Sequence, residues 1–158
     1  ASADTPSASS ASAPAAGGES AALDRLYAAN HELVLRGRDS VAAAIAPFLG
    51  PRAPLLNPPA RDDRVARGTG SMTTLVLPDE PAGTPVRPTL YDDPLQDALV
   101  ERHAIVVPIW RFSATNQRVL RISAQVYNTI EQYQALASAL THELARELDL
   151  AGGIGPRA

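Results

Sequence analysis

Residues 118–148 read RVLRISAQVYNTIEQYQALASALTHELAREL, and they hold the clearest change from strand to helix in the chain. At the start of this stretch, Leu120 and Ile122 alternate with other residue types, which predicts a strand with one buried face. From Thr129 onward, apolar residues recur at steps of three and four, and Thr129 with Gln132 has the spacing of a capping box. The stretch therefore predicts a strand followed by an amphipathic helix.

A long helix is expected near the start of the chain. From Ala21, apolar residues recur at steps of about three and four, and Pro47 with Gly50 ends the pattern. The expected apolar stripe consists of Leu23, Leu26, Tyr27, Leu33, Val34, Val41, Ile45 and Phe48. A helix of this length suits a connector, and Gly37 is expected to weaken it by about 1 kcal/mol relative to Ala.

Two strands and a short helix are expected between these segments. Residues 72–77 are rich in β-branched side chains and predict a strand. Asp93 and Gln96 have the positions of an N-cap and an N3 residue, so they predict a helix start. Residues 105–110 predict a buried strand, and Pro108 implies that this strand lies at a sheet edge or bends there. The order of elements predicts an α+β fold: a small, mainly antiparallel sheet with helices on one face, led by the long N-terminal connector helix.

Composition limits the domain organisation and the chemistry. The 158 residues suit one domain, with residues 1–20 as a low-complexity linker or disordered tail, residues 21–150 as the domain, and residues 151–158 as a flexible tail. A net charge of −3 argues against a nucleic-acid partner bound through a broad basic surface. The chain has no Cys, and its 14 Lys and Arg residues are all arginines, so it lacks thiolate and lysine chemistry of its own.

No apolar run approaches the length of about 20 residues that crosses a bilayer, so no membrane association is expected. No charged region followed by an apolar one opens the sequence, and this pattern favours a cytoplasmic location. These two expectations rest on the sequence alone.

Most candidate reactive groups have a plain structural explanation. His31, His103 and His142 lack metal-ligand spacing, so we expect surface histidines and no metal site. The adjacent pairs Asp62-Asp63 and Asp92-Asp93 do not favour paired-carboxylate catalysis, because sequence neighbours do not converge on one substrate. The glycines at 68 and 70 precede a strand and lack a third glycine, so they do not indicate a phosphate-binding loop.

Arg121 is the most informative polar residue. It lies on the strand face opposite Leu120 and Ile122, where a guanidinium can hold a carboxylate through two parallel hydrogen bonds. From the residues alone, an exposed arginine on a sheet remains the simpler interpretation.

The stretch Arg121-Ile-Ser123-Ala-Gln-Val-Tyr127-Asn128-Thr129, followed by an amphipathic helix, resembles a C-terminal motif of the class V aminotransferase family of fold-type-I pyridoxal-phosphate enzymes. Residues 99–109 and 70–78 are similar to the isopenicillin-N epimerase-like branch of that family. Residues 30–35 resemble its segment between the large and small domains. The resemblance covers about residues 22–150.

This resemblance implies that residues 21–150 are the small C-terminal domain of such an enzyme. Arg121 would bind the α-carboxylate of an amino-acid substrate, and Ser123, Tyr127 and Asn128 would support it. Pyridoxal phosphate and its Schiff-base lysine would belong mainly to a large domain or partner subunit, so no catalytic residue is expected in this chain. By analogy with the family, we expect a homo- or hetero-oligomer.

The reaction stays open between epimerisation, transamination and lyase chemistry. Residues 111–117 match the position of the loop cysteine of cysteine desulfurases but contain no Cys, which excludes persulfide chemistry. Two other interpretations remain: a stand-alone module that binds small carboxylates, and an inactive fragment whose exposed apolar faces would promote self-association.

Overall fold

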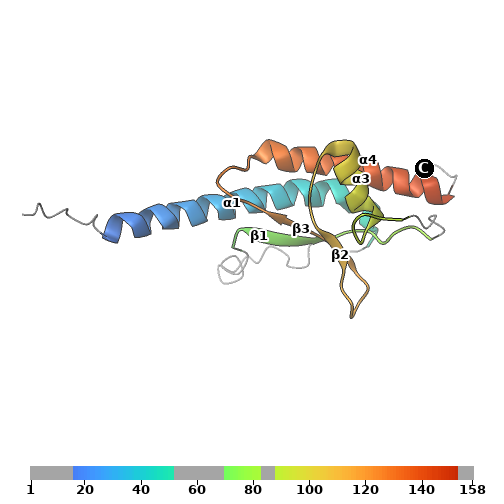
Figure 1. Cartoon of the computed structure of the whole chain (residues 1–158), viewed down its shortest axis with the longest axis horizontal. Helices are drawn as coiled ribbons and strands as arrows, with labels where there is room; N and C mark the ends of the chain where they lie inside the picture. Colours follow the sequence, from blue (N-terminus) through green and yellow to red (C-terminus); the bar gives the residue numbers. More distant parts are fainter. Residues whose placement is uncertain (1–15, 52–69, 83–87, 153–158) are drawn as a thin grey trace, which may run out of the picture.

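The computed structural model describes residues 16–51, 70–82 and 88–152. In order along the chain, its elements are α1 (Ala16–Leu49), β1 (Met72–Val76), α3 (Pro94–His103), β2 (Ile109–Arg111), β3 (Arg118–Ser123) and α4 (Ile130–Gly152). Helices α1 and α4 lie side by side over one face of a three-stranded antiparallel sheet, and α3 packs against α4 (Figure 1). The expected α+β architecture with a long leading helix is therefore confirmed.

Strand β3 is the centre of the sheet, in the order β1-β3-β2. It pairs with β1 from Met72 opposite Ser123 to Val76 opposite Val119, and with β2 from Ile109 opposite Leu120. The alternation along β3 follows the prediction, because Leu120 and Ile122 are buried toward the helices while Arg121 and Ser123 are exposed.

The strand predicted over residues 105–110 is wrong for most of its length. Only Ile109–Arg111 pair as β2, at the edge of the sheet, and residues 105–108 lie outside the ladder. Pro108 has no N–H to donate, although its carbonyl accepts a hydrogen bond from the Arg121 amide at 3.2 Å. Ala104, in the left-handed conformation with φ of 54°, ends α3 and directs the chain into this segment.

The core lies between the sheet and the two long helices. Gly37 of α1 lies under the ring of Tyr133 in α4, where an added Cβ would be only 2.6 Å from Tyr133 Cγ. Gly37 is thus a close-approach site between the helices and not simply a weak point of α1. The predicted apolar stripe fails at its start: Leu23 and Tyr27 are exposed, because this end of α1 extends beyond the sheet (Figure 1). The buried part of α1 consists mainly of Val34, Val41, Ile45 and Leu49.

The helix ends agree with the predicted caps in most respects. Asp93 caps α3 by accepting a hydrogen bond from the Leu95 amide at 3.0 Å. Gln96 does not complete a capping box, because its Oε1 accepts the amide of Ile109 and so holds β2 against α3. Helix α1 begins at Ala16 and includes residues 16–20, which the sequence assigned to a linker. Extension of an existing helix needs no new nucleus, which accounts for the earlier start.

In the described ranges, none of the helices has the length and apolar character needed to span a membrane.

Candidate functional site

A pocket of about 420 Å³ lies where the end of β3 meets the start of α4 and the segment before β2. The residues nominated from the motif, Arg121, Ser123, Tyr127 and Asn128, all line it. Residues 104–108 form a second wall, and α4 contributes further lining side chains. The fold therefore brings the motif together with a segment from which β2 separates it in the sequence.

The backbone of β3 places Arg121 at this pocket. Arg121 pairs with Thr74 of β1, and its amide donates to Pro108 on the other side, so its main chain is held from both flanks. Its side chain is on the exposed face of the strand. Among the residues that the structure describes, none forms an ion pair or a hydrogen bond with the Arg121 guanidinium. No described residue therefore competes with a ligand for its donors.

Asn128 organises the turn between β3 and α4. Its Oδ1 accepts the Gln125 amide at 2.9 Å, and its Nδ2 donates to Gln132 Oε1 at 2.9 Å. Gln132 Oε1 also accepts the Thr129 amide at 3.2 Å, which is the Gln half of the predicted capping box. These contacts fix the turn that carries Tyr127, so Asn128 acts on the shape of the pocket.

Tyr133 lines the pocket and connects two of its elements. Its hydroxyl donates to the carbonyl of Ser123 at 2.7 Å, which ties the end of β3 to α4. Burial raises the pKa of Tyr133 above its usual value. The Tyr133 hydroxyl is therefore a neutral structural donor. Tyr127, by contrast, is exposed at the pocket.

The pocket is suited to binding an anion. Arg121 is the one charged side chain among its described lining residues, which include no Asp, Glu or His. A guanidinium binds a carboxylate in a planar, two-bond geometry. The described lining contains no side chain that accepts protons near neutral pH, so it offers no acid–base group.

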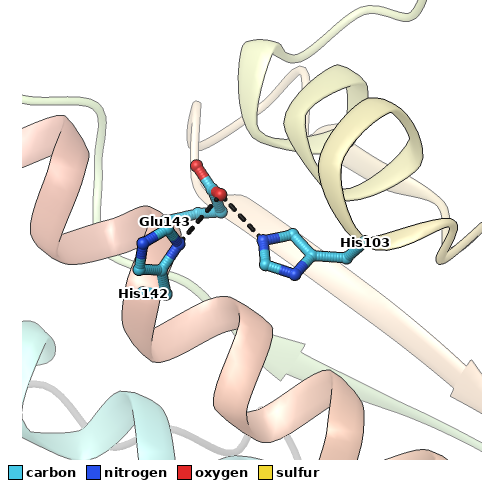
Figure 2. Close-up of side chains that lie close together, drawn as sticks. All are labelled: His103, His142 and Glu143. Atoms are coloured by element: carbon cyan, nitrogen blue, oxygen red, sulfur yellow. Dashed lines mark hydrogen bonds and ion pairs between the residues drawn. The ribbon is translucent and has the colours of Figure 1, made fainter.

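A second polar cluster lies between helices α3 and α4, around Glu143 of α4 (Figure 2). Glu143 Oε1 accepts from Arg102 Nε at 2.9 Å and lies 2.8 Å from His103 Nε2 and 3.1 Å from His142 Nδ1. The Glu143 side chain is only 2% exposed, but the surrounding side chains form several hydrogen bonds with its carboxylate. Burial alone would raise its pKa, but the hydrogen bonds from Arg102, His103 and His142 lower it to about 2.

This cluster joins α3 to α4 and explains two of the three histidines. Sequence analysis treated His103 and His142 as separate surface residues, but their ring centroids lie 5.7 Å apart. His142 is exposed, as expected, whereas His103 is only partly so. No sequence spacing signals the pairing, because it depends on which helices meet. His31 lies apart from them, with Nδ1 3.0 Å from the Gly70 carbonyl oxygen.

The same cluster has the residue types of a metal site, since the ligand atoms of His103, His142 and Glu143 lie within 4.8 Å of one another. However, Glu143 is the single anion, and two arginines already approach it: Arg102 binds both of its oxygens, and Arg146 Nε lies 3.8 Å from Oε2. These positive charges oppose the binding of a divalent cation. The cluster is accounted for as an ion-pair contact between two helices.

Arg118 lies on the same strand as Arg121, but it is buried and paired with carboxylates. The sequence did not indicate this role. It is fully buried on the helix-facing side of β3, between Asp93 and Glu147. Burial lowers the pKa of Arg118, but the hydrogen bonds that it donates to Glu147 and Asp93 outweigh this and raise the pKa above its usual value. The sequence could have predicted that Arg118 faces the core, because it has the same strand parity as Leu120 and Ile122.

The remaining candidates do not converge on the pocket. Asp93 is committed to its cap and to Arg118, and Asp92 is exposed. Asp62, Asp63 and Gly68 lie outside the described residues.

Comparison with known proteins does not assign a family. A scan against models of protein families finds no match to the chain, and a search of curated proteins finds none. The geometry around Arg121 and the motif that contains it are therefore the basis for a proposed function.

Proposed function

We propose that this chain is the small, substrate-binding domain of a pyridoxal-phosphate enzyme of the class V aminotransferase type. In this proposal, Arg121 binds the carboxylate of an amino-acid-like substrate. The observation that carries it is that Arg121, whose guanidinium makes no ion pair or hydrogen bond with a described residue, lines a pocket together with Ser123, Tyr127 and Asn128. The proposal places the assembled enzyme in the cytoplasm, with no nucleic-acid or membrane partner.

The residues of this chain fit the substrate better than the cofactor. The sequence contains no Lys, and the described pocket holds a single cation, so the chain lacks the lysine through which pyridoxal phosphate is held. We therefore assign the cofactor and its lysine to a large domain or a partner subunit, joined to this chain in a homo- or hetero-oligomer. When bound there, the cofactor supplies the electron sink for chemistry at the substrate Cα.

The contribution of this chain is orientation. A bidentate contact from Arg121 fixes the plane of the carboxylate, and thereby limits how the neighbouring Cα is presented. Asn128 fixes the turn between β3 and α4, and Tyr133 ties the end of β3 to α4 through the Ser123 carbonyl. Both contacts hold the pocket walls in place. Whether the reaction is an epimerisation, a transamination or an elimination is decided by groups on the partner.

Native mass spectrometry of the tagged chain, purified from its own cells, tests the assembly. The expected species contains a larger polypeptide and the mass of pyridoxal phosphate. In that complex, Arg121→Gln should lower kcat/KM by about 10- to 100-fold, because hydrogen bonds to charged groups contribute about 1.5–3 kcal/mol. Arg111→Gln, an arginine outside the pocket, is the matched control and should have little effect. A complex without pyridoxal phosphate, or unchanged kinetics for the Arg121 variant, would show the proposal to be wrong.

A stand-alone carboxylate-binding module is the second candidate, and one observation favours it. Three segments of this chain line one pocket: residues 104–108, the end of β3 and the start of α4. This function predicts a chain that purifies alone and binds small carboxylates without pyridoxal phosphate. Calorimetry that detects no heat with any carboxylate would exclude it.

A further inference from the structure

We infer that the Arg121 pocket selects carboxylates with one negative charge and an aliphatic chain, and that it does not recognise the substrate's amino group. This inference deepens the proposed function, because it depends on Arg121 as the carboxylate anchor. It assigns the selection of substrate class to this chain and the recognition of nitrogen to the partner.

The charge of the pocket limits the ligand to one carboxylate. Arg121 is the single cation among the described lining residues. One bidentate contact with a carboxylate occupies the paired N–H donors of its guanidinium. The neighbouring arginine of the same strand, Arg118, points to the opposite face and is committed to Asp93 and Glu147. A second carboxylate of a dicarboxylic acid would lose water at the wall without gaining a counterion.

The wall beside Arg121 is aliphatic. The hydrogen bond from the Arg121 amide to the Pro108 carbonyl places this wall directly next to the main chain of Arg121, and both line the pocket. Residues 104–108 read AIVVP, and Val106 is 72% exposed although it is apolar. Leu136 adds apolar surface from α4. A ligand whose carboxylate binds Arg121 therefore has its aliphatic chain beside exposed apolar surface, and contact between them removes that surface from water.

The polar side chains that line the pocket are neutral apart from Arg121, and several already make hydrogen bonds. Asn128 Oδ1 accepts the Gln125 amide, and Gln132 Oε1 accepts from both Asn128 and Thr129. The Ser123 carbonyl accepts the Tyr133 hydroxyl. With no carboxylate among the described lining residues, only neutral oxygen atoms are left to face an amino group. The described lining thus offers an ammonium no negatively charged partner.

Binding of small probes to the full chain, followed by isothermal titration and backbone NMR shifts, tests the inference. The probes are 4-methylpentanoate, leucine (the same skeleton with an amino group), glutarate as a dicarboxylate, and 4-methylpentan-1-ol. We expect 4-methylpentanoate and leucine to bind within about 3-fold of each other. Glutarate should bind at least about 10-fold more weakly, and the alcohol should not shift the pocket residues.

Two variants locate the effect. Val106→Asp places a negative charge on the aliphatic wall and should weaken 4-methylpentanoate binding by about 10-fold or more. Val126→Asp is the matched control, because Val126 is equally exposed but does not line the pocket. Arg121→Gln should abolish binding of every carboxylate.

The possible results distinguish a failure of the inferred selectivity from a failure of Arg121 as the carboxylate anchor. If glutarate binds as tightly as 4-methylpentanoate, or leucine binds more than about 10-fold tighter, the inferred selectivity is wrong while Arg121 remains a carboxylate anchor. Equal effects of the two valine variants would also overturn the aliphatic wall. If no carboxylate binds, or Arg121→Gln changes nothing, the role of Arg121 fails, and the proposed function fails with it.

Discussion

Replacing Arg118 with Met should destabilise the fold by about 3–5 kcal/mol, because the change removes one partner of a buried ion-pair network. Arg118 is 0% exposed, and its guanidinium donates to Asp93 Oδ2 at 2.8 Å and to both oxygens of Glu147 at 2.9 Å. Without it, two carboxylates remain in a largely water-excluded site. Methionine supplies a similar length and apolar contact, so the loss reports on charge and hydrogen bonding more than on volume.

The matched control is the same substitution on the other face of the same strand. Arg121→Met changes an exposed arginine that makes no described ion pair, so its effect on stability should stay within about 0.5 kcal/mol. A triple variant, Arg118→Met with Asp93→Asn and Glu147→Gln, removes the stranded charges together. It should regain part of the loss, because replacing a whole buried network is far less costly than breaking it.

Urea unfolding, followed by far-ultraviolet circular dichroism and Trp110 fluorescence, measures these differences. With a slope of about 1.5 kcal/mol per molar urea, the Arg118 variant should lose about 2–3 M in its midpoint. The reasoning is refuted if Arg118→Met and Arg121→Met unfold within about 1 kcal/mol of each other. It is also refuted if the triple variant is no more stable than Arg118→Met.

Three smaller perturbations test other contacts. Gly37→Ala should destabilise the fold by about 1–2 kcal/mol in a urea titration despite the better helix propensity of Ala, because the new Cβ meets Tyr133 Cγ at 2.6 Å; a gain in stability would contradict the close approach. Ala104→Gly should raise stability by about 1 kcal/mol in the same assay, since φ of 54° at this C-cap strains an L-residue, and a loss would argue against the left-handed cap. The pKa of Glu143 is lowered to about 2 from 4.5, so its contribution is complete above pH 4.5 and is lost as the pH falls toward 2. Thermal unfolding between pH 2 and 6 should show a shallower acid slope for Glu143→Gln than for the parent chain, and identical slopes would exclude this role.

The sequence by itself determined most of the elements and, in β3, the orientation of the two faces. Strand β3 and helix α4 follow from the spacing of apolar residues, and the start of α3 follows from Asp93. The outward position of Arg121 follows from its parity with Leu120 and Ile122. These predictions succeed because periodicity and capping depend on neighbours within about four residues.

Only the tertiary structure decided which distant groups meet. The sequence alone does not show that residues 104–108 leave the ladder to form a pocket wall, or that Glu143 binds Arg102, His103 and His142 across two helices. The same holds for Arg118, whose inward parity was readable but whose partners Asp93 and Glu147 were not. An arginine can pair with any carboxylate within reach, and the packing of helices on the sheet alone determines which carboxylates those are.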